Sequence, residues 1–491
     1  MELTKDLKSI VDLGIALTGE KDYERLLGRI LRESINITGS DGGILYVKEQ
    51  SELRFRIVQN KTLGITHGGN NDFIKNTHVN MEEEDDVCVY SAIHKKVVNV
   101  ADVYENDRFN FQRTFQYDKE KGYRTHSLLV VPLVNHDNEI MGVLKLINAL
   151  DDTGKVITYE KKYEYIVYAL ASQAAVTLDN MSHMEQMKKL LYSMVSAFTT
   201  AIDERTPYNA NHTKNVAKYT GELIDYINGC YGRGETSLHF NGRQKEQIVM
   251  AALLHDIGKL TTPLKIMNKA TRLGERLPVV ISRMELIECK NKIDFMEEKV
   301  SREEYERRCR YLIEAKKLVE RADTAPYLDK STLRAIDDLA NHSYTEANGT
   351  EIPYITELEK ESLSILKGTL TGAERKIMEE HVVITSKLLG KICFSKDYEM
   401  VPALAGAHHE FLNGTGYPNH LTEPDIPNEA RILTVLDIYD SLISTDRPYK
   451  QPIPVPRALD TLDEMAAEGK LDMELVRLLR AMVEGRTAAD H

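Results

Sequence analysis

From Tyr163 to Thr200 the chain contains neither glycine nor proline, and this run separates two regions of different character. Its apolar residues recur at spacings of three, four and seven, the pattern of a long helix with an apolar seam. Before the run, helical and strand-like patterns alternate, whereas after it almost every segment has a helical pattern. The sequence therefore predicts two domains of different class, at 1–162 and 201–491, joined by a helix at 163–200.

The apolar seam of the joining helix favours pairing with a second copy of the chain. Packed against its own domain, such a helix needs no special role. Between two domains it favours a parallel two-fold dimer that transmits a rotation or a shift. We therefore expect a homodimer through this helix. The seam residues are Ile166, Leu170, Ala174, Met181, Met184, Leu191, Val195 and Phe198.

Composition excludes several classes of protein. The 491 residues include 63 basic and 76 acidic side chains, a formal net charge of −13, whereas an extended nucleic-acid surface needs clustered cations. A small basic pocket for a nucleotide remains compatible with this balance. No run approaches the ~20 apolar residues of a bilayer span, and the five cysteines are scattered. We expect a cytoplasmic protein without a nucleic-acid polymer or a membrane as partner.

The first region begins with an amphipathic helix pattern at 22–38, and short β-rich runs follow. The last two runs are joined by VNHDNE, whose asparagine and aspartate favour a tight turn, so we expect an antiparallel hairpin. The expected strands are Gly43–Val47, Phe55–Val58, Ser127–Leu133 and Ile140–Ile147.

Over about 20–180 this region resembles a GAF domain. The resemblance rests on the first helix, on the stretch Gly122–Asn148 and on a helix from about Thr158. It implies an α+β domain, an antiparallel sheet with flanking helices, that binds a small molecule or dimerises. Some GAF domains bind cyclic nucleotides through a set of residues that begins with Asn-Lys after the final strand, but here Asn148 is followed by Ala149. An unidentified small-molecule ligand and a purely scaffolding role both remain open.

The second region contains the motif LLHDIGKL, which follows the apolar helix pattern QIVMAALL. His255 offers a nitrogen ligand and Asp256 an oxygen ligand that can bridge two ions, and both reach one centre only where the helix distorts. Lys259 is expected on the same helix face as His255, where a cation can hold a phosphate oxygen or protonate a leaving alkoxide. The motif indicates a metal phosphohydrolase of the HD superfamily.

A pair of histidines, His408 and His409, precedes the glycine-rich loop FLNGTGYP. Consecutive side chains on a helix point about 100° apart, so both bind one ion only with irregular local geometry. Alone, such a pair is more often a surface or capping feature than a ligand pair. Combined with the loop and with HDIGK, it indicates a metal site.

From about Ser196 to Glu484 the chain resembles an HD-GYP domain, the family of bacterial cyclic dinucleotide phosphodiesterases. The family's naming residues are present as His255 and Asp256 and as Gly416, Tyr417 and Pro418. Further landmarks are His212 in the opening helix, His381 in LTGAERKIMEEH, Asp437 in ARILTVLDIYDSL, and the basic turn with Arg447 and Lys450.

The resemblance implies an all-α HD helical bundle with a binuclear metal site. Asp256 is expected to bridge two divalent first-row ions, with iron or manganese favoured. One ion is completed by His212, His255 and Asp437, and the other by His381, His408 and His409. Some members hold a third metal through a glutamate, but Tyr208 stands at that position.

The implied activity is hydrolysis of cyclic di-GMP to linear pGpG, with GMP as a further product. Asp256 and Lys259 are the expected catalytic residues. Lys259, Arg447 and Lys450 are candidates for phosphate contacts, and Gly416, Tyr417 and Pro418 for the wall around the guanine or ribose. Asp440 is expected to orient a ligand histidine.

Two alternatives remain open. The family commonly has a basic residue and an acid where this chain has Phe411 and Asn413. These departures permit another cyclic dinucleotide, such as cyclic GMP-AMP. The chain could also be a cyclic di-GMP receptor without hydrolytic activity.

An insertion at about 273–368 separates His255 from His381 by far more than the few tens of residues of a compact domain. Its pattern is charged and helical. It is either a decorative helical hairpin or a regulatory lid that covers the active site or contacts the GAF domain.

Overall fold

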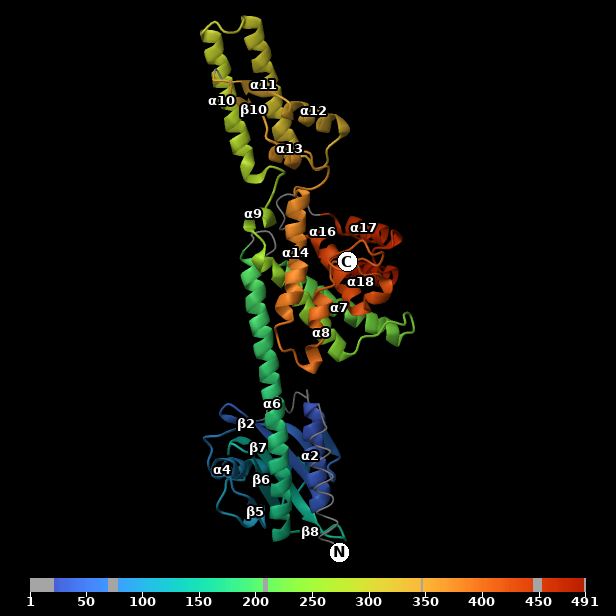
Figure 1. Ribbon diagram of the computed structural model, residues 1–491. Coiled ribbons are helices and arrows are strands. Elements are labelled where there is room, and N and C mark those ends of the chain that lie inside the picture. The colour runs from blue at the N-terminus through green and yellow to red at the C-terminus, as the bar shows by residue number, and fades with distance from the viewer. Residues whose placement is uncertain (1–21, 69–77, 206–210, 346–347, 445–452, 490–491) are drawn as a thin grey trace. The chain divides into compact units, whose positions relative to one another are not determined.

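The computed structural model describes residues 22–68, 78–205, 211–345, 348–444 and 453–489, which form two compact units (Figure 1). The first unit ends at Leu191 and the second begins at Tyr192. The division falls inside helix α6, Lys161–Asp203, which is continuous across it. The predicted joining helix is therefore present as one helix, longer than the run without glycine and proline.

The described part of the first unit contains one antiparallel sheet of eight strands. The strand order is β3-β2-β1-β7-β6-β5, with β4 paired to β2 and β8 to β7. The predicted hairpin is formed by β6 and β7, in which Val131 pairs with Leu144. The strands are β1 Ser40–Glu49, β2 Glu52–Asn60, β3 Ile65–Gly68, β4 His78–Asn80, β5 Val98–Val100, β6 Leu128–Val134, β7 Ile140–Leu150 and β8 Val156–Ile157.

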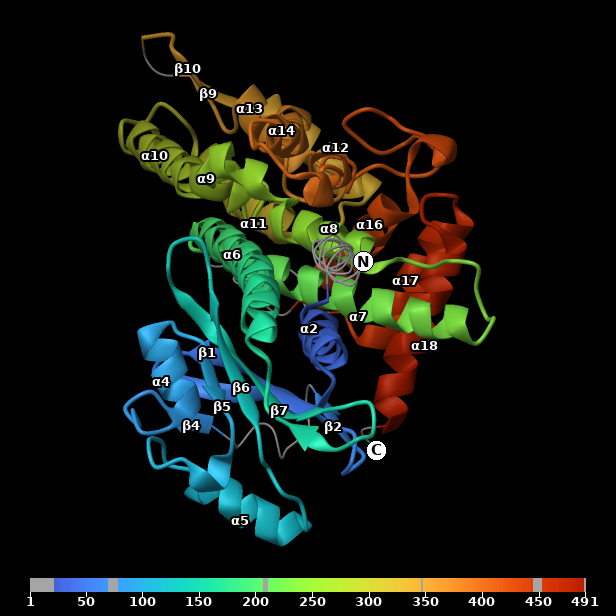
Figure 2. The same ribbon diagram turned by 90° about the horizontal axis from the view of Figure 1, so that it is seen from below.

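Helices cover both faces of this sheet (Figure 2). Helix α2, Tyr23–Thr38, lies with the first part of α6 on one face, and α4, Val87–His94, lies on the other. The two faces alternate along β7, because Leu144 packs toward α2 and α6 whereas Val143 packs toward α4. The remaining elements are η1 Val103–Glu105 and α5 Gln112–Lys121.

The predicted seam of α6 divides into two parts. Leu170 and Ala174 are buried in the core beneath the sheet, so the first part packs within its own unit. Farther along, Met184 is 59% exposed and Phe198 is 43% exposed. The same apolar periodicity therefore serves the core of the first unit, and farther along it leaves Met184 and Phe198 exposed whereas Val195 is buried.

The second unit is built mainly from helices. Capping boxes begin three of the described helices: Asn241 with Gln244 at α8, Thr356 with Glu359 at α13 and Thr371 with Glu374 at α14. The elements are α7 His212–Gly232, α8 Gly242–Leu254, η2 Ile257–Thr261, α9 Leu264–Met267, α14 Gly372–Leu389, η4 Lys396–Tyr398, α15 Val401–Ala405, η5 Glu423–Asp425, α16 Asn428–Ile443, α17 Val455–Ala467 and α18 Met473–Ala489.

The insertion has its own apolar core, formed by residues between Leu273 and Leu363. It is helical, as expected, but it also contains a short hairpin, β9 with β10, that the helical pattern did not predict. Its two ends lie together, because the Thr369 hydroxyl donates to the Lys269 carbonyl at 3.0 Å. The elements are η3 Gly274–Arg276, α10 Leu277–Met296, α11 Arg302–Thr324, α12 Lys330–Ala340, β9 Ser343–Thr345, β10 Glu351–Pro353 and α13 Glu357–Leu363.

Among the described residues, no helix combines the length and the apolar character needed to cross a bilayer.

Candidate metal centre

The HDIGK motif lies at a break between two helices. Helix α8 ends at Leu254, His255 follows as its C-cap, and Asp256 precedes the 3₁₀ helix η2. The expectation that Lys259 shares a helix face with His255 is therefore wrong, because the α-helix ends before both residues. The break turns the two neighbouring side chains toward each other, with 3.3 Å between His255 Nε2 and Asp256 Oδ2.

Helix α14 packs closely against this break. The Gly258 amide donates to the Thr385 hydroxyl at 3.0 Å, and that hydroxyl donates to the His255 carbonyl at 2.9 Å. A side-chain carbon at Gly258 would lie 1.9 Å from the His381 carbonyl oxygen. The absence of a side chain at Gly258 therefore allows the contact that places His381 Nε2 3.4 Å from Asp256 Oδ1.

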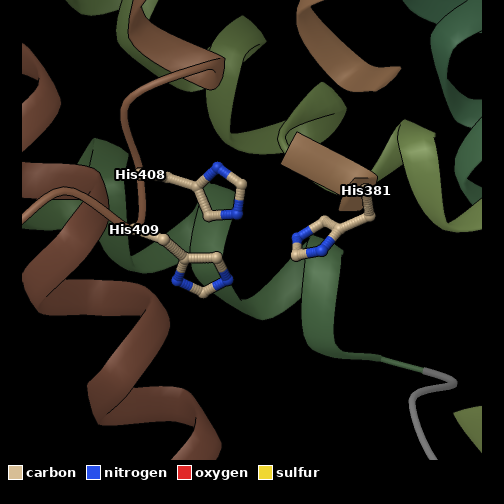
Figure 3. Close-up of side chains that lie close together, drawn as sticks. All are labelled: His381, His408 and His409. Atoms are coloured by element: carbon tan, nitrogen blue, oxygen red, sulfur yellow. The ribbon is translucent and has the colours of Figure 1, made fainter. Parts of the chain in front are cut away.

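Six other predicted ligands form two groups, and within each the ligand atoms lie within 4.8 Å of one another. The first is His212, His255 and Asp437, and the second is His381, His408 and His409. Figure 3 shows the ring of His381 turned toward those of His408 and His409. Asp256 lies between the groups, since one carboxylate oxygen faces His255 and the other faces His381.

Three histidines are held in the orientation that metal ligands adopt. The Nδ1 atoms of His255, His381 and His408 each contact the carbonyl oxygen of the residue three positions earlier, at 2.7, 2.6 and 2.6 Å. Because Nδ1–H donates there, Nε2 carries the lone pair. These Nε2 atoms are buried and have no hydrogen-bond partner among the described residues, and the same is true of Asp256 Oδ1. Such buried polar atoms are costly when left unpaired, so the donor set fits a metal.

His212 is held by carboxylates. Its Nδ1 lies 2.7 Å from Asp440 Oδ2, and its Nε2 lies 3.0 Å from Asp437 Oδ1. Burial disfavours the protonated ring, but the hydrogen bonds with Asp437 and Asp440 outweigh it and raise the pKa of His212 to about 9. A metal ion at Nε2 would take the place of that proton.

The other charges also suit a cation. Burial lowers the pKa of His381 to about 4 and that of His408 well below its usual value, so both rings are neutral near pH 7. Burial opposes ionisation of Asp256, yet Lys259 and His255 hold the pKa of its carboxyl well below the usual range. Neutral imidazoles and ionised carboxylates together are the donors that first-row divalent metals prefer.

Lys259 and the GYP loop lie beside these groups. Lys259 Nζ is 2.6 Å from Asp256 Oδ2, and the lysine side chain is 17% exposed. The Tyr417 amide donates to the His409 carbonyl at 3.1 Å, and the two rings lie 4.8 Å apart. A side-chain carbon at Gly416 would lie 2.3 Å from the Phe411 nitrogen, so this turn requires glycine.

Pro418 follows Tyr417 through a cis peptide bond. The predicted contacts Arg447 and Lys450, and the position of Tyr208, lie outside the described residues.

Sequence reasoning missed three residues that build the site. Glu410 is buried, and its carboxylate accepts from the amides of Asn419 and Leu421 at 2.7 and 2.9 Å, which fastens the GYP loop. Its place directly after two histidines was the available signal. Thr385 lies one turn after His381, a spacing that could have suggested it. Arg205, which contacts the backbone after HDIGK, gave no local signal.

Comparison with protein families identifies both regions of the chain. The GAF domain family matches residues 22–178, and two HD domain families match residues 209–341 and 355–475. The chain carries a GAF domain followed by HD domains. The predicted fold class, an α+β GAF domain followed by a mostly helical HD region, is confirmed.

Several curated relatives of the chain are phosphodiesterases by name. A 3'3'-cGAMP-specific phosphodiesterase 3 of Vibrio cholerae is 37% identical over 97 residues, which is 20% of each chain. A cyclic di-GMP phosphodiesterase of Thermotoga maritima is 36% identical over 104 residues, 21% of this chain and 27% of the relative. A cyclic di-GMP phosphodiesterase response regulator of Xanthomonas campestris is 35% identical over 126 residues, which are 26% of this chain and 32% of the relative. The chain thus spans a fifth to a third of the length of these relatives.

Solved structures similar to the chain include GAF domains. One is from an Acinetobacter phosphoenolpyruvate-protein phosphotransferase, with 12% identity and a TM-score of 0.29, covering 37% of this chain and 98% of that one. Another is a GAF domain/HD domain protein of Geobacter sulfurreducens, with 12% identity and a TM-score of 0.26. The match covers 34% of this chain and 97% of that one.

Proposed function

We propose that this protein is a metal-dependent phosphodiesterase of the HD-GYP type that hydrolyses a cyclic dinucleotide, with cyclic di-GMP as the first candidate. One observation carries the proposal. Asp256 lies between two groups of predicted ligands, and the buried Nε2 atoms of His255, His381 and His408 lack hydrogen-bond partners among the described residues. The relatives named as cyclic di-GMP and cGAMP phosphodiesterases support the substrate class.

The residues present fit two metal ions, with Asp256 shared between them. His212, His255 and Asp437 would hold one ion, and His381, His408 and His409 the other. The mixture of imidazole and carboxylate favours iron or manganese. When bound, such a metal pair activates water for attack on phosphorus and offsets the negative charge that develops there.

Lys259 is the described cation best placed to act on the substrate. Its Nζ lies beside Asp256, and the side chain keeps some contact with solvent. From there it can bind a non-bridging phosphate oxygen or donate a proton to the leaving 3′ oxygen. Tyr417, beside His409, would form part of the wall that holds a base or ribose, together with Gly416 and Pro418. Phosphate contacts by Arg447 and Lys450 stay predictions.

The GAF domain would control this activity through α6. Met184, Met187, Met194 and Phe198 are all exposed on the helix, at spacings of three, seven and four. This stripe supports a homodimer in which the helices pair, and a ligand of the GAF domain would act by changing that pairing.

Turnover with two substrates tests the proposal. The full chain, purified without oxygen and loaded with iron or manganese, is assayed with cyclic di-GMP and with 3'3'-cGAMP, and products are separated by chromatography. We expect hydrolysis that Asp256→Ala abolishes. The matched control is Asp225→Ala, because Asp225 is exposed and pairs with Lys245.

The relative rates identify the substrate. Faster turnover of cyclic GMP-AMP than of cyclic di-GMP would identify cyclic GMP-AMP as the preferred substrate. Binding of either compound without turnover, in protein that contains two metals per chain, would favour the receptor function instead.

A further inference from the structure

Arg205 follows the last turn of α6 and contacts the backbone directly after the HD motif. Its Nη1 donates to the carbonyls of Lys259, at 3.1 Å, and of Leu260, and its Nη2 donates to the Thr262 carbonyl at 3.3 Å. These carbonyls end the 3₁₀ helix η2, whose N-cap is Asp256. One side chain thus holds the end of the segment that begins at a predicted metal ligand.

The chemistry of the contact is specific to arginine. Carbonyls at the end of a helix commonly lack partners within the helix and find donors elsewhere. Here the Lys259 carbonyl also accepts from the Thr262 amide at 3.1 Å, and the guanidinium adds donors to it and to the carbonyls of Leu260 and Thr262. A guanidinium carries five N–H donors in a rigid planar fork, so it can hold three carbonyls at once. A lysine ammonium at the same position would be a single compact donor on a flexible stem.

The segment is held on two sides. On one side the Gly258 amide donates to Thr385 of α14, and a larger residue at Gly258 would collide with the His381 carbonyl. On the other side Arg205 holds the carbonyls. Lys259 lies between the two restraints, and its Nζ reaches Asp256 Oδ2. Loss of Arg205 would remove its hydrogen bonds to these carbonyls and leave the one to Thr385 of α14.

Arg205 is also joined to α6. Its amide donates to the Ile202 carbonyl at 3.1 Å, and Ile202 and Thr199 in the last turn are buried. A shift of the end of α6 would therefore move the guanidinium together with the helix.

We propose that Arg205 is a positioning residue that holds Lys259 against Asp256 and couples the end of α6 to the catalytic segment. The inference rests on the proposed function, because it assigns a role within that reaction. Among the residues that the structure describes, no hydrogen bond joins the Arg205 side chain to a predicted metal ligand or to Gly416, Tyr417 and Pro418, so its role would be exercised through Lys259.

A double-mutant cycle in the metal-loaded full chain tests this role. We expect Arg205→Ala to lower kcat for the cyclic dinucleotide about 10- to 100-fold, as misplaced catalytic groups do, with metal content unchanged. Because both residues act through one amine, Arg205→Ala combined with Lys259→Met should be no slower than Lys259→Met alone. Arg205→Lys should not restore the rate.

The control is Arg233→Ala, which removes an exposed arginine paired with Glu235. Two results would overturn the role. In one, the effects of Arg205→Ala and Lys259→Met multiply in the double variant. In the other, Arg205→Ala loses metal in proportion to activity, as a purely structural residue would.

Hydrogen exchange tests the contact without any turnover. Amides in a peptide covering 256–262 should exchange faster in Arg205→Ala than in the parent chain, and Arg233→Ala should leave them unchanged. Unchanged exchange in Arg205→Ala would refute the proposed restraint. A parent chain that binds metal but turns nothing over would count against the proposed function, and exchange would then decide the restraint on its own.

Discussion

A histidine that binds a metal through one ring nitrogen is oriented by the partner of the other nitrogen. In this protein three such partners are backbone carbonyls, those of Ala252, Met378 and Ala405. The fourth is the carboxylate of Asp440, which contacts His212 Nδ1 and is itself buried. Asp440 is therefore the one orienting partner of these four that a side-chain substitution can alter.

Asp440→Asn should weaken metal binding by about 10- to 100-fold, because the amide does not hold the His212 ring as the carboxylate does. Metal titration of the purified full chain measures the change. The control is Asp225→Asn at an exposed position, and metal affinity equal to that of the parent chain would contradict the role of Asp440.

Gly258→Ala should disturb the site through the backbone, because the added methyl would lie 1.9 Å from the His381 carbonyl oxygen. Either η2 or α14 must shift, and overpacking of this kind typically costs about 1–3 kcal/mol. We expect a lower melting temperature and loss of bound metal. Gly242→Ala is the matched control, since nothing lies within 4 Å of that position. Full metal content in Gly258→Ala would show that the contact is not needed.

Helix α6 combines two functions along one periodic pattern. Its first part is a core helix of the GAF domain, with Leu170 and Ala174 buried. Its later part leaves Met184 and Met194 exposed while Val195 is buried. A partner helix would cover this exposed stripe. A charged side chain introduced into the stripe would then lose its contact with water, at a cost in free energy that disfavours pairing of the helices.

If the proposed homodimer forms through α6, Met184→Glu and Leu191→Glu should each weaken it at least tenfold, the effect of about 1.4 kcal/mol of lost association energy. Sedimentation velocity over a range of concentrations measures the association. Gln186→Glu adds the same charge at an exposed position outside the stripe and should leave the dimer intact. An unchanged sedimentation profile together with unchanged activity would argue against dimeric control.

At the level of the whole chain, the insertion has the properties of a separable part. Its core is its own, and its ends meet at Lys269 and Thr369. Within the part of the chain that the structure describes, no hydrogen bond or ion pair of the seven predicted ligands reaches 273–368.

Replacing 273–368 by a short glycine-serine linker should therefore leave metal content unchanged and retain turnover within a fewfold. Metal analysis and the cyclic dinucleotide assay of the variant without 273–368 measure the metal content and the turnover. The parent chain carried through the same purification is the reference. Loss of turnover with metal retained would instead favour a regulatory lid over a decorative helical hairpin.

Local sequence patterns predicted much of this protein because they depend on neighbouring residues. The spacing of apolar side chains predicted α2, α6 and the β6–β7 hairpin, and the HD and GYP motifs named side chains whose chemistry suits a metal. The sequence did not predict the shortest elements. Strands β9 and β10 pair as three-residue segments, which are too short to show a periodic pattern of apolar residues.

The arrangement of those side chains depended on contacts between distant segments. Periodicity placed Lys259 on the face of His255, but α8 ends at Leu254 and the packing of Gly258 on α14 sets where both residues lie. Folding brings Asp440 to His212 and Arg205 to the Lys259 carbonyl, although no local pattern links these pairs. Residue type determines which atoms can bind a metal or a phosphate. Packing across the chain determines which of those atoms are turned inward, paired or left open, because burial and hydrogen bonding depend on every segment that closes around them.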